Sequence, residues 1–109
     1  MPVHKRSIQE KRAEDARYRE LRDRLVAEWR GEAGGPPAPD IDEETDTRDR
    51  VMHVVVTWDA WADVDAQTRS EIIVDAFQAV KGQEAITNLT LAMGLTSGEA
   101  GRLRSAAGR

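Results

Sequence analysis

The sequence has no cysteine and no long apolar run, and each absence excludes a class of protein. Without cysteine the chain has no disulfide, no thiolate nucleophile and no thiolate metal ligand. No stretch approaches the roughly 20 apolar residues of a membrane-spanning helix. The basic N-terminal residues are followed by no apolar segment of the kind found in secretory signals. These absences predict a cytoplasmic protein that makes no contact with a membrane.

Aromatic residues are scarce as well. Three tryptophans, one tyrosine and one phenylalanine cannot fill a core alone, so Val, Ile, Leu and Ala must build most of it. The 109 residues suffice for one domain. The net charge of −4 favours solubility and disfavours a surface devoted to nucleic acid.

Helix breakers and charge divide the chain into three segments. Residues 1–30 carry a net charge of +3, residues 31–50 carry −5, and residues 51–109 carry −2. The first segment is predicted to be a charged amphipathic helix. The second combines Gly and Pro with acidic residues, which predicts a flexible, disordered linker, with a short edge strand around Ile41 as the alternative. The third is predicted to be a compact α+β domain with a small β-sheet and a crossover helix.

A strand and a helix open the third segment. Val51–Trp58 is rich in β-branched residues, as expected of a strand that is covered on both faces or lies central in a sheet. Asp65 is placed to cap a helix that runs to Val80, and Gly82 is placed to end it. The apolar face of this helix consists of Ile72, Ile73, Ala76, Phe77 and Val80.

A second strand and a final helix complete the domain. The strand is predicted over Ile86–Met93, with Leu89, Leu91 and Met93 facing inwards and Gly94 at its end. Thr96 and Glu99 form a capping-box pattern that opens the last helix. Strands joined by a crossover helix are expected to be parallel. Because two strands do not make a stable sheet, a third must come from the linker or from a second copy of the chain.

An apolar stripe runs along the predicted N-terminal helix and requires burial. Its members follow helical spacing: Tyr18, Leu21, Leu25 and Trp29. The stripe can dock on its own domain, on a second copy or on another protein. We favour a homodimer, since the 59 residues from Val51 onwards approach the size at which a single core is marginal.

Two other groups are candidate contact residues. Trp58 and Trp61 lie three apart around a turn, where they form either a platform for a base or a peptide or, as we favour, part of the core. Arg12, Arg19 and Arg22 are candidate nucleic-acid contacts on the first helix, although the acidic residues between them weaken a phosphate-binding stripe.

The sequence offers little catalytic or metal-binding chemistry. His53 lies in a predicted strand, where a lone histidine is more often structural than catalytic. A calcium loop that starts at Asp63 fails, because Thr68 stands where Gly is needed and Val74 where a bidentate Glu belongs. We therefore predict no catalytic residue, no metal site and no cofactor, and an enzyme is the least favoured class.

Residues 51–100 resemble the BolA family of small α+β proteins with a class II KH-like topology. The resemblance rests on Thr57-Trp58-Asp59-Ala60-Trp61-Ala62 before a helix, on the strand Thr87-Asn88-Leu89-Thr90-Leu91, and on Leu95-Thr96-Ser97-Gly98-Glu99. It implies the same order of elements. It does not extend to the family's handling of an iron–sulfur cluster with a glutaredoxin, because Arg69-Ser70-Glu71 replaces its Arg-His-Arg and Thr87 or Asn88 replaces its histidine ligand.

The sequence therefore favours a non-enzymatic protein-interaction or adaptor module that associates with a protein partner or with itself. The alternative is a nucleic-acid-binding regulator that uses the arginine-rich helix and a KH-like domain. The two hypotheses differ in whether binding depends strongly on salt.

Overall fold

The structure is a computed structural model that describes residues 8–32 and 35–107, and side chains over residues 16–32 and 35–105. Residues 1–7, 33–34 and 108–109 lie outside this description. The described elements, in chain order, are α1 (Ile8–Trp29), β1 (Asp40–Thr45), β2 (Val51–Thr57), the 3-10 helix η1 (Asp59–Asp63), α2 (Ala66–Lys81), α3 (Gln83–Ile86), β3 (Leu91–Leu95) and α4 (Ser97–Ala107). The chain is an α+β protein, as the sequence predicts.

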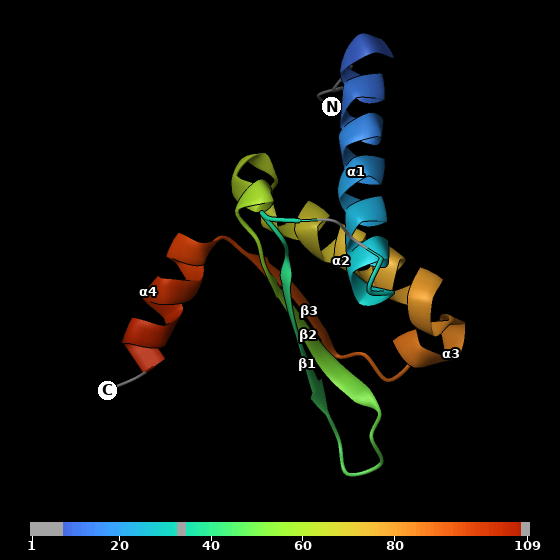
Figure 1. The fold of residues 1–109 in the computed structure, drawn as a ribbon, viewed down its shortest axis with the longest axis vertical. Coiled ribbons are helices and arrows are strands. Elements are labelled where there is room, and N and C mark those ends of the chain that lie inside the picture. Colours follow the sequence, from blue (N-terminus) through green and yellow to red (C-terminus); the bar gives the residue numbers. More distant parts are fainter. Residues whose placement is uncertain (1–7, 33–34, 108–109) are drawn as a thin grey trace, which may run out of the picture.

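One three-stranded sheet forms the centre of the fold, in the order β1-β2-β3. β1 and β2 are antiparallel, whereas β2 and β3 are parallel and joined through α2 and α3. The predicted parallel crossover is confirmed. Figure 1 shows α1, α2 and α3 on one side of the sheet, while α4 projects on the other side.

The third strand comes from the acidic segment that the sequence predicts to be a linker. Asp40–Thr45 forms β1, so the flexible-linker prediction fails for these residues, and the alternative of a strand around Ile41 is the one observed. Ile41 pairs with Val56 and packs against the core, while the acidic side chains of the strand remain exposed. One apolar residue suffices here because β1 is an edge strand whose position is fixed by its ladder with β2.

The core lies between the sheet and α2. Val54 and Val56 of β2 are buried against the apolar face of α2, in which Phe77 is fully buried. The helix begins where Asp65 accepts a hydrogen bond from the Thr68 N–H at 2.8 Å, and it ends at Gly82 with φ 92°. Both predicted ends of this helix are confirmed.

The stripe on α1 docks within the same chain. Leu21 and Leu25 are 2% and 0% exposed and belong to the core. The Trp29 ring lies against Phe77 of α2, with centroids 5.6 Å apart and planes tilted by 59°. The sequence leaves three docking partners open for this helix. In the structure the helix docks on its own domain.

The last strand differs from its prediction. Gln83–Ile86 forms the helical turn α3, and β3 begins only at Leu91. Gly94 lies inside the strand and not at its end. The predicted inward direction of Leu91 and Met93 is also wrong, because Ala92 between them packs against the core.

Candidate interaction surface

The sheet has one face covered by helices and one open face. Val54 and Val56 are fully buried on the covered face. Because successive side chains of a strand point to opposite faces, His53 and Val55 point to the other face. α4 is the helix on that side, and it leaves the sheet at an angle (Figure 1). Part of this face therefore remains accessible.

The strand register defines which residues share this face. Val55 lies opposite Asp42 on β1 and Met93 on β3, and residues directly opposite one another in a sheet point to the same side. We call this surface the open face. It consists of Asp40, Asp42, Glu44, His53, Val55, Thr57, Leu91, Met93 and Leu95.

The open face carries accessible apolar area. Leu91 is 39% exposed, and Leu103 is 52% exposed on α4, the helix on this side of the sheet (Figure 1). In the part of the chain that the structure describes, these are the exposed large hydrophobic side chains. Met93, two residues further along β3, and Val55, opposite Met93 on β2, are half-buried and adjoin Leu91 on this face, so Leu91 is not an isolated apolar residue. Such patches mark binding surfaces.

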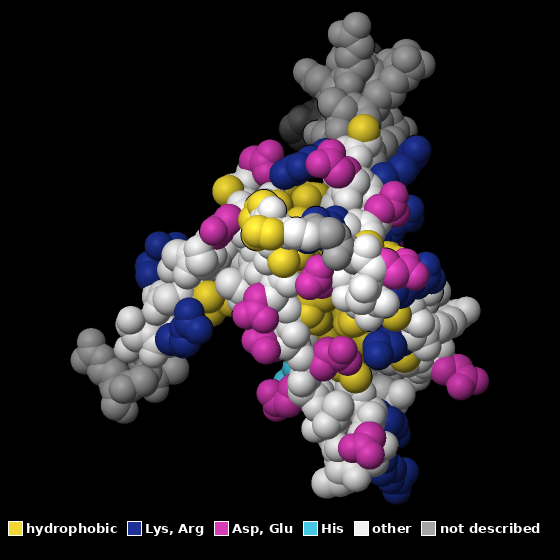
Figure 2. All heavy atoms as spheres, in the orientation of Figure 1, with side chains coloured by type: hydrophobic (Ala, Val, Ile, Leu, Met, Phe, Trp, Pro, Cys, Tyr) yellow, Lys and Arg dark blue, Asp and Glu magenta, His cyan; other side chains and the backbone are white. Residues whose placement is uncertain are grey.

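Charge on this side of the molecule is separated by element. Asp40, Asp42 and Glu44 of β1 are exposed, whereas exposed Arg102 and Arg104 flank Leu103 on α4. Figure 2 shows acidic side chains along the strands and basic side chains on α4. The open face is therefore apolar at β3 and acidic at β1, and it is adjacent to a basic helix.

Arg69 fixes the position of α4 relative to the sheet. This buried guanidinium donates to the backbone carbonyls of Trp61 at 2.8 Å, Val64 at 2.7 Å and Gly94 at 3.2 Å. Its Nη1 also lies 2.6 Å from Glu99 Oε1. Arg69 thus bonds four acceptors at once, whereas the ammonium group of a lysine has only three donors.

The first turn of α4 carries the predicted capping box. Glu99 accepts a hydrogen bond from the Thr96 N–H at 2.8 Å, and Thr96 Oγ1 accepts one from the Glu99 N–H at 3.2 Å. Asp59 of η1 accepts from the Ser97 N–H at 2.8 Å and from its hydroxyl at 2.7 Å. α4 is thereby tied to η1 and α2 at its N-terminus.

The hydrogen bonds at the start of α4 favour the ionised form of the two carboxylates that accept them, Asp59 and Glu99. The Ser97 N–H and hydroxyl hold the pKa of Asp59 below its ordinary value. The Thr96 N–H, and then the Arg69 side chain, lower the pKa of Glu99. Both groups therefore stay ionised to lower pH than free carboxyls do, and they stabilise the structure in that form.

Side chains of α2 occupy the outer edge of β3. The Leu95 carbonyl accepts from the Trp58 N–H, so it points towards β2, and the carbonyls of Ala92 and Gly94 point away from it. Ser70 Oγ donates to the Ala92 carbonyl at 2.7 Å, and Arg69 donates to that of Gly94. β3 therefore presents its apolar side chains on the open face while the carbonyls at its edge are already bonded.

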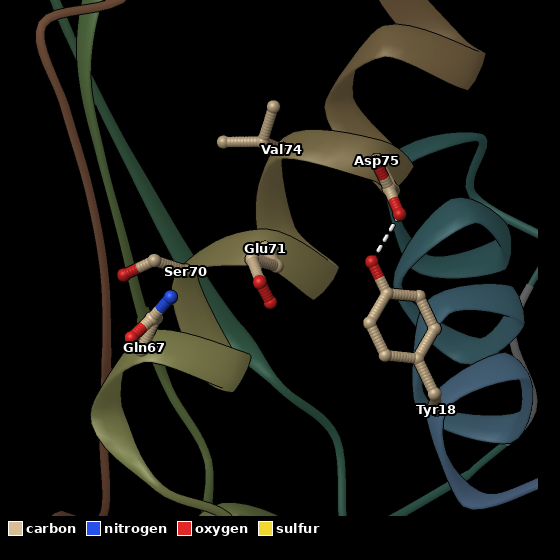
Figure 3. Close-up of a pocket in the computed structure, with 6 residues that line it drawn as sticks. All are labelled: Tyr18, Gln67, Ser70, Glu71, Val74 and Asp75. Atoms are coloured by element: carbon tan, nitrogen blue, oxygen red, sulfur yellow. Dashed lines mark hydrogen bonds between the residues drawn. The ribbon is translucent and has the colours of Figure 1, made fainter. Parts of the chain in front are cut away.

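An open cleft of about 500 Å³ lies between α1 and α2 on the helical side (Figure 3). Tyr18 of α1 points across it and donates a hydrogen bond to Asp75 of α2. Burial, and then the bond to Asp75, raise the pKa of Tyr18 above its ordinary value, so its phenol keeps its proton. The cleft is where α1 is attached to α2.

The residues predicted for protein contacts lie mainly in the core. Leu21, Leu25, Trp58 and Trp61 are all buried, so they offer no surface to a partner in this conformation. The two tryptophan rings meet edge to face with centroids 5.2 Å apart, which supports the core interpretation over the platform.

Tyr18 and Trp29 are half-buried and bonded within the chain. Tyr18 donates to Asp75, and Trp29 Nε1 donates to Glu43 at 3.1 Å. The residues predicted for protein contacts are therefore mostly internal. Both the stripe on α1 and the tryptophan turn pack against apolar side chains of their own domain.

The residues predicted for nucleic-acid contacts are dispersed. Arg19 is exposed, and Arg22 donates to its neighbour Asp23 at 3.2 Å. Arg12 lies outside the residues whose side chains the structure describes. The described side chains of α1 thus show acidic partners beside the basic residues and no continuous basic stripe.

His53 lies on the open face, where its Nδ1 is 3.6 Å from Glu44 Oε1. Among the described residues, no three His, Asp or Glu side chains gather closely enough to hold a metal ion. Over the same residues, none of the helices combines the length and apolar character that a bilayer crossing requires.

Sequence reasoning missed Arg69 and the open face. An arginine near the start of a helix carries no signal that it will be buried, because burial depends on carbonyls supplied by η1 and β3. The sequence shows an alternation of Leu89, Leu91 and Met93, but such a pattern does not determine which face of the sheet it occupies, and the inward direction predicted for Leu91 and Met93 is wrong. Comparisons with protein-family models, curated proteins and solved structures give no match to the chain.

Proposed function

We propose that this chain is a non-enzymatic, cytoplasmic protein-interaction module that binds a protein partner through the open face. The observation that carries the proposal is the exposure of Leu91 on the open face and of Leu103 on α4, the helix on the same side of the sheet. Fully burying a leucine contributes about 1.5–3 kcal/mol, so burying the exposed parts of Leu91 and Leu103 adds a share of that from each side chain to the free energy of binding. The surrounding carboxylates supply the polar rim that interfaces of this kind require.

The pKa values of the carboxyl groups support a binding role over a catalytic one. A general acid or base works best with a pKa near neutrality. The pKa values of Asp59, Asp65 and Glu99 are instead lowered by hydrogen bonds that cap helices or join elements. These three carboxylates therefore serve the structure of the chain.

The order of elements supports a likeness to the BolA family at the level of the fold. The structure contains a helix, two antiparallel strands, a crossover and a strand parallel to the second, in that order. Under this proposal the KH-like topology provides a sheet with an accessible face. The proposal does not include binding of an iron–sulfur cluster.

Nucleic acid is the competing partner class, and charge disfavours it. Asp40, Asp42 and Glu44 stand on the open face, where they would repel phosphates. On α1, Arg17 donates to Glu20 and Arg24 lies 3.8 Å from Glu28, so part of the basic charge is already compensated. A protein with basic residues fits this surface better.

A photo-reactive residue at position 91, used in extract of the source cells, tests the proposal. We expect a discrete crosslinked protein, either a second copy or another chain. The same residue at position 79, exposed on α2, is the matched control and is expected to give no discrete product. Equal labelling at both positions, or a salt-dependent gel shift with nucleic acid in place of a crosslink, would overturn the proposal.

A further inference from the structure

We infer that the partner on the open face is a second copy of this chain, with α4 of each copy lying across the open face of the other. The inference rests on the proposed function, because it names the occupant of the same surface. Exposed apolar area, the distribution of charge and the attachment of α4 all support it.

The apolar surfaces of α4 and the sheet do not cover each other within one chain. Leu103 is 52% exposed and Leu91 is 39% exposed although both lie on the same side of the sheet. In Figure 1 α4 diverges from the strands after its first turn. Each copy thus offers one apolar helix and one apolar sheet patch, which are complementary in kind.

The charges of α4 and of the open face are opposite, so α4 is complementary to the open face and not to another α4. Leu103 is flanked by Arg102 and Arg104, whereas the apolar patch is bordered by Asp42 and Glu44. A helix placed on the apolar patch of a second copy brings its arginines towards those carboxylates. Under two-fold symmetry the same contact occurs twice, so each copy gives and receives one helix.

The attachment of α4 argues against closure on its own sheet. Glu99 is bonded to Arg69, and Ser97 is bonded to Asp59. Swinging α4 onto its own open face would break these bonds and leave the buried Arg69 guanidinium without the carboxylate that balances its charge. A second copy can cover the face while α4 keeps its direction.

Charge reversal in two matched variants tests the inference. In one variant Asp42→Arg and Glu44→Arg make the face basic; in the other Arg102→Glu and Arg104→Glu make the helix acidic. We expect wild type to sediment at twice the 12.1 kDa chain mass, and each variant alone to dimerise at least about tenfold more weakly. An equimolar mixture should restore the dimer, since each contact then pairs opposite charges.

Control variants distinguish an effect of charge at the proposed interface from an effect of the net charge of the protein. Glu71→Arg with Glu84→Arg, and Arg30→Glu with Arg48→Glu, reverse exposed charges elsewhere and should leave the dimer unchanged. If a face variant does not fold, Leu103→Lys at an exposed helical position provides a second test with the same expectation.

Three results would overturn the inference. One is a wild-type monomer at tens of micromolar, another is a dimer that neither charge reversal weakens, and the third is a mixture that stays monomeric. A wild-type monomer whose position 91 still crosslinks to another protein would refute the second copy but leave the proposed function intact.

Discussion

Arg69 Nη1 lies 2.6 Å from Glu99 Oε1 and 3.2 Å from the Gly94 carbonyl, so one guanidinium joins α2, β3 and α4. Arg69→Met keeps much of the apolar stem but leaves these acceptors without a donor. We expect it to lower the free energy of unfolding by about 3 kcal/mol. Urea denaturation measures this. Arg22→Met, at an arginine paired only with its neighbour Asp23, should cost about 0.5 kcal/mol or less, and equal losses would contradict the assignment.

Gly94 is required by close packing. A Cβ there would lie 2.9 Å from Trp61 Nε1 and from Arg69 Cβ, and neither can move without disturbing the core. Gly94→Ala should therefore cost about 1–3 kcal/mol through overpacking. Gly101→Ala in α4 meets nothing within 4 Å and should instead stabilise by about 0.5–1 kcal/mol. Thermal unfolding of both variants shows whether the signs differ.

The two tryptophans of the turn should respond differently to removal of the indole nitrogen. Trp61 Nε1 donates to the Val56 carbonyl at 3.1 Å, whereas buried Trp58 Nε1 has no partner among the described residues. Trp61→Phe loses a buried hydrogen bond, while Trp58→Phe removes an unsatisfied donor. We expect Trp61→Phe to be the more destabilising by about 1–2 kcal/mol in denaturant titrations. The reverse order would show that ring size decides.

Docking of α1 contributes to global stability. Leu25 is fully buried between α1 and the core, so Leu25→Ala should cost about 2–5 kcal/mol. Arg19→Ala on the exposed side of the same helix should change stability by about 0.5 kcal/mol or less. Circular dichroism during urea unfolding measures both. A Leu25→Ala variant as stable as wild type would mean that α1 does not dock in solution.

Stability should decline in acid through the carboxylate that holds α4. The pKa of Asp59 in the folded state is lowered, so its contribution is complete above the unfolded value of about 4 and is lost as the pH falls through the folded value. Asp59→Asn should therefore be less stable than wild type at neutral pH, and the difference should shrink below about pH 4. Urea midpoints at several pH values measure it; a difference independent of pH would contradict this role.

The sequence specified α2 well because its signals are local. Asp65 and Gly82 mark its ends through capping geometry, and Phe77 belongs to an apolar face that any sheet would cover. Each of these signals acts within a few residues, so no knowledge of the tertiary structure was needed.

The sequence could not specify β3 in the same way. After Gly82 the chain turns twice more, with the Thr87 N–H bonded to the Glu84 carbonyl and the Leu89 N–H to that of Ile86, which delays the strand. Which face Leu91 occupies depends on the register with β2, a tertiary property. The candidate surface was missed for this reason, while the stripe on α1 was found but its docking partner was undetermined.

The bonding at the two margins of the sheet has a consequence for behaviour at high concentration. On one margin Ser70 and Arg69 occupy the carbonyls of Ala92 and Gly94, and on the other β1 carries a row of carboxylates. Fibrils grow by adding strands to such margins, and occupied acceptors or like charges prevent that addition. The protein should therefore remain dispersed without forming amyloid even when it is concentrated.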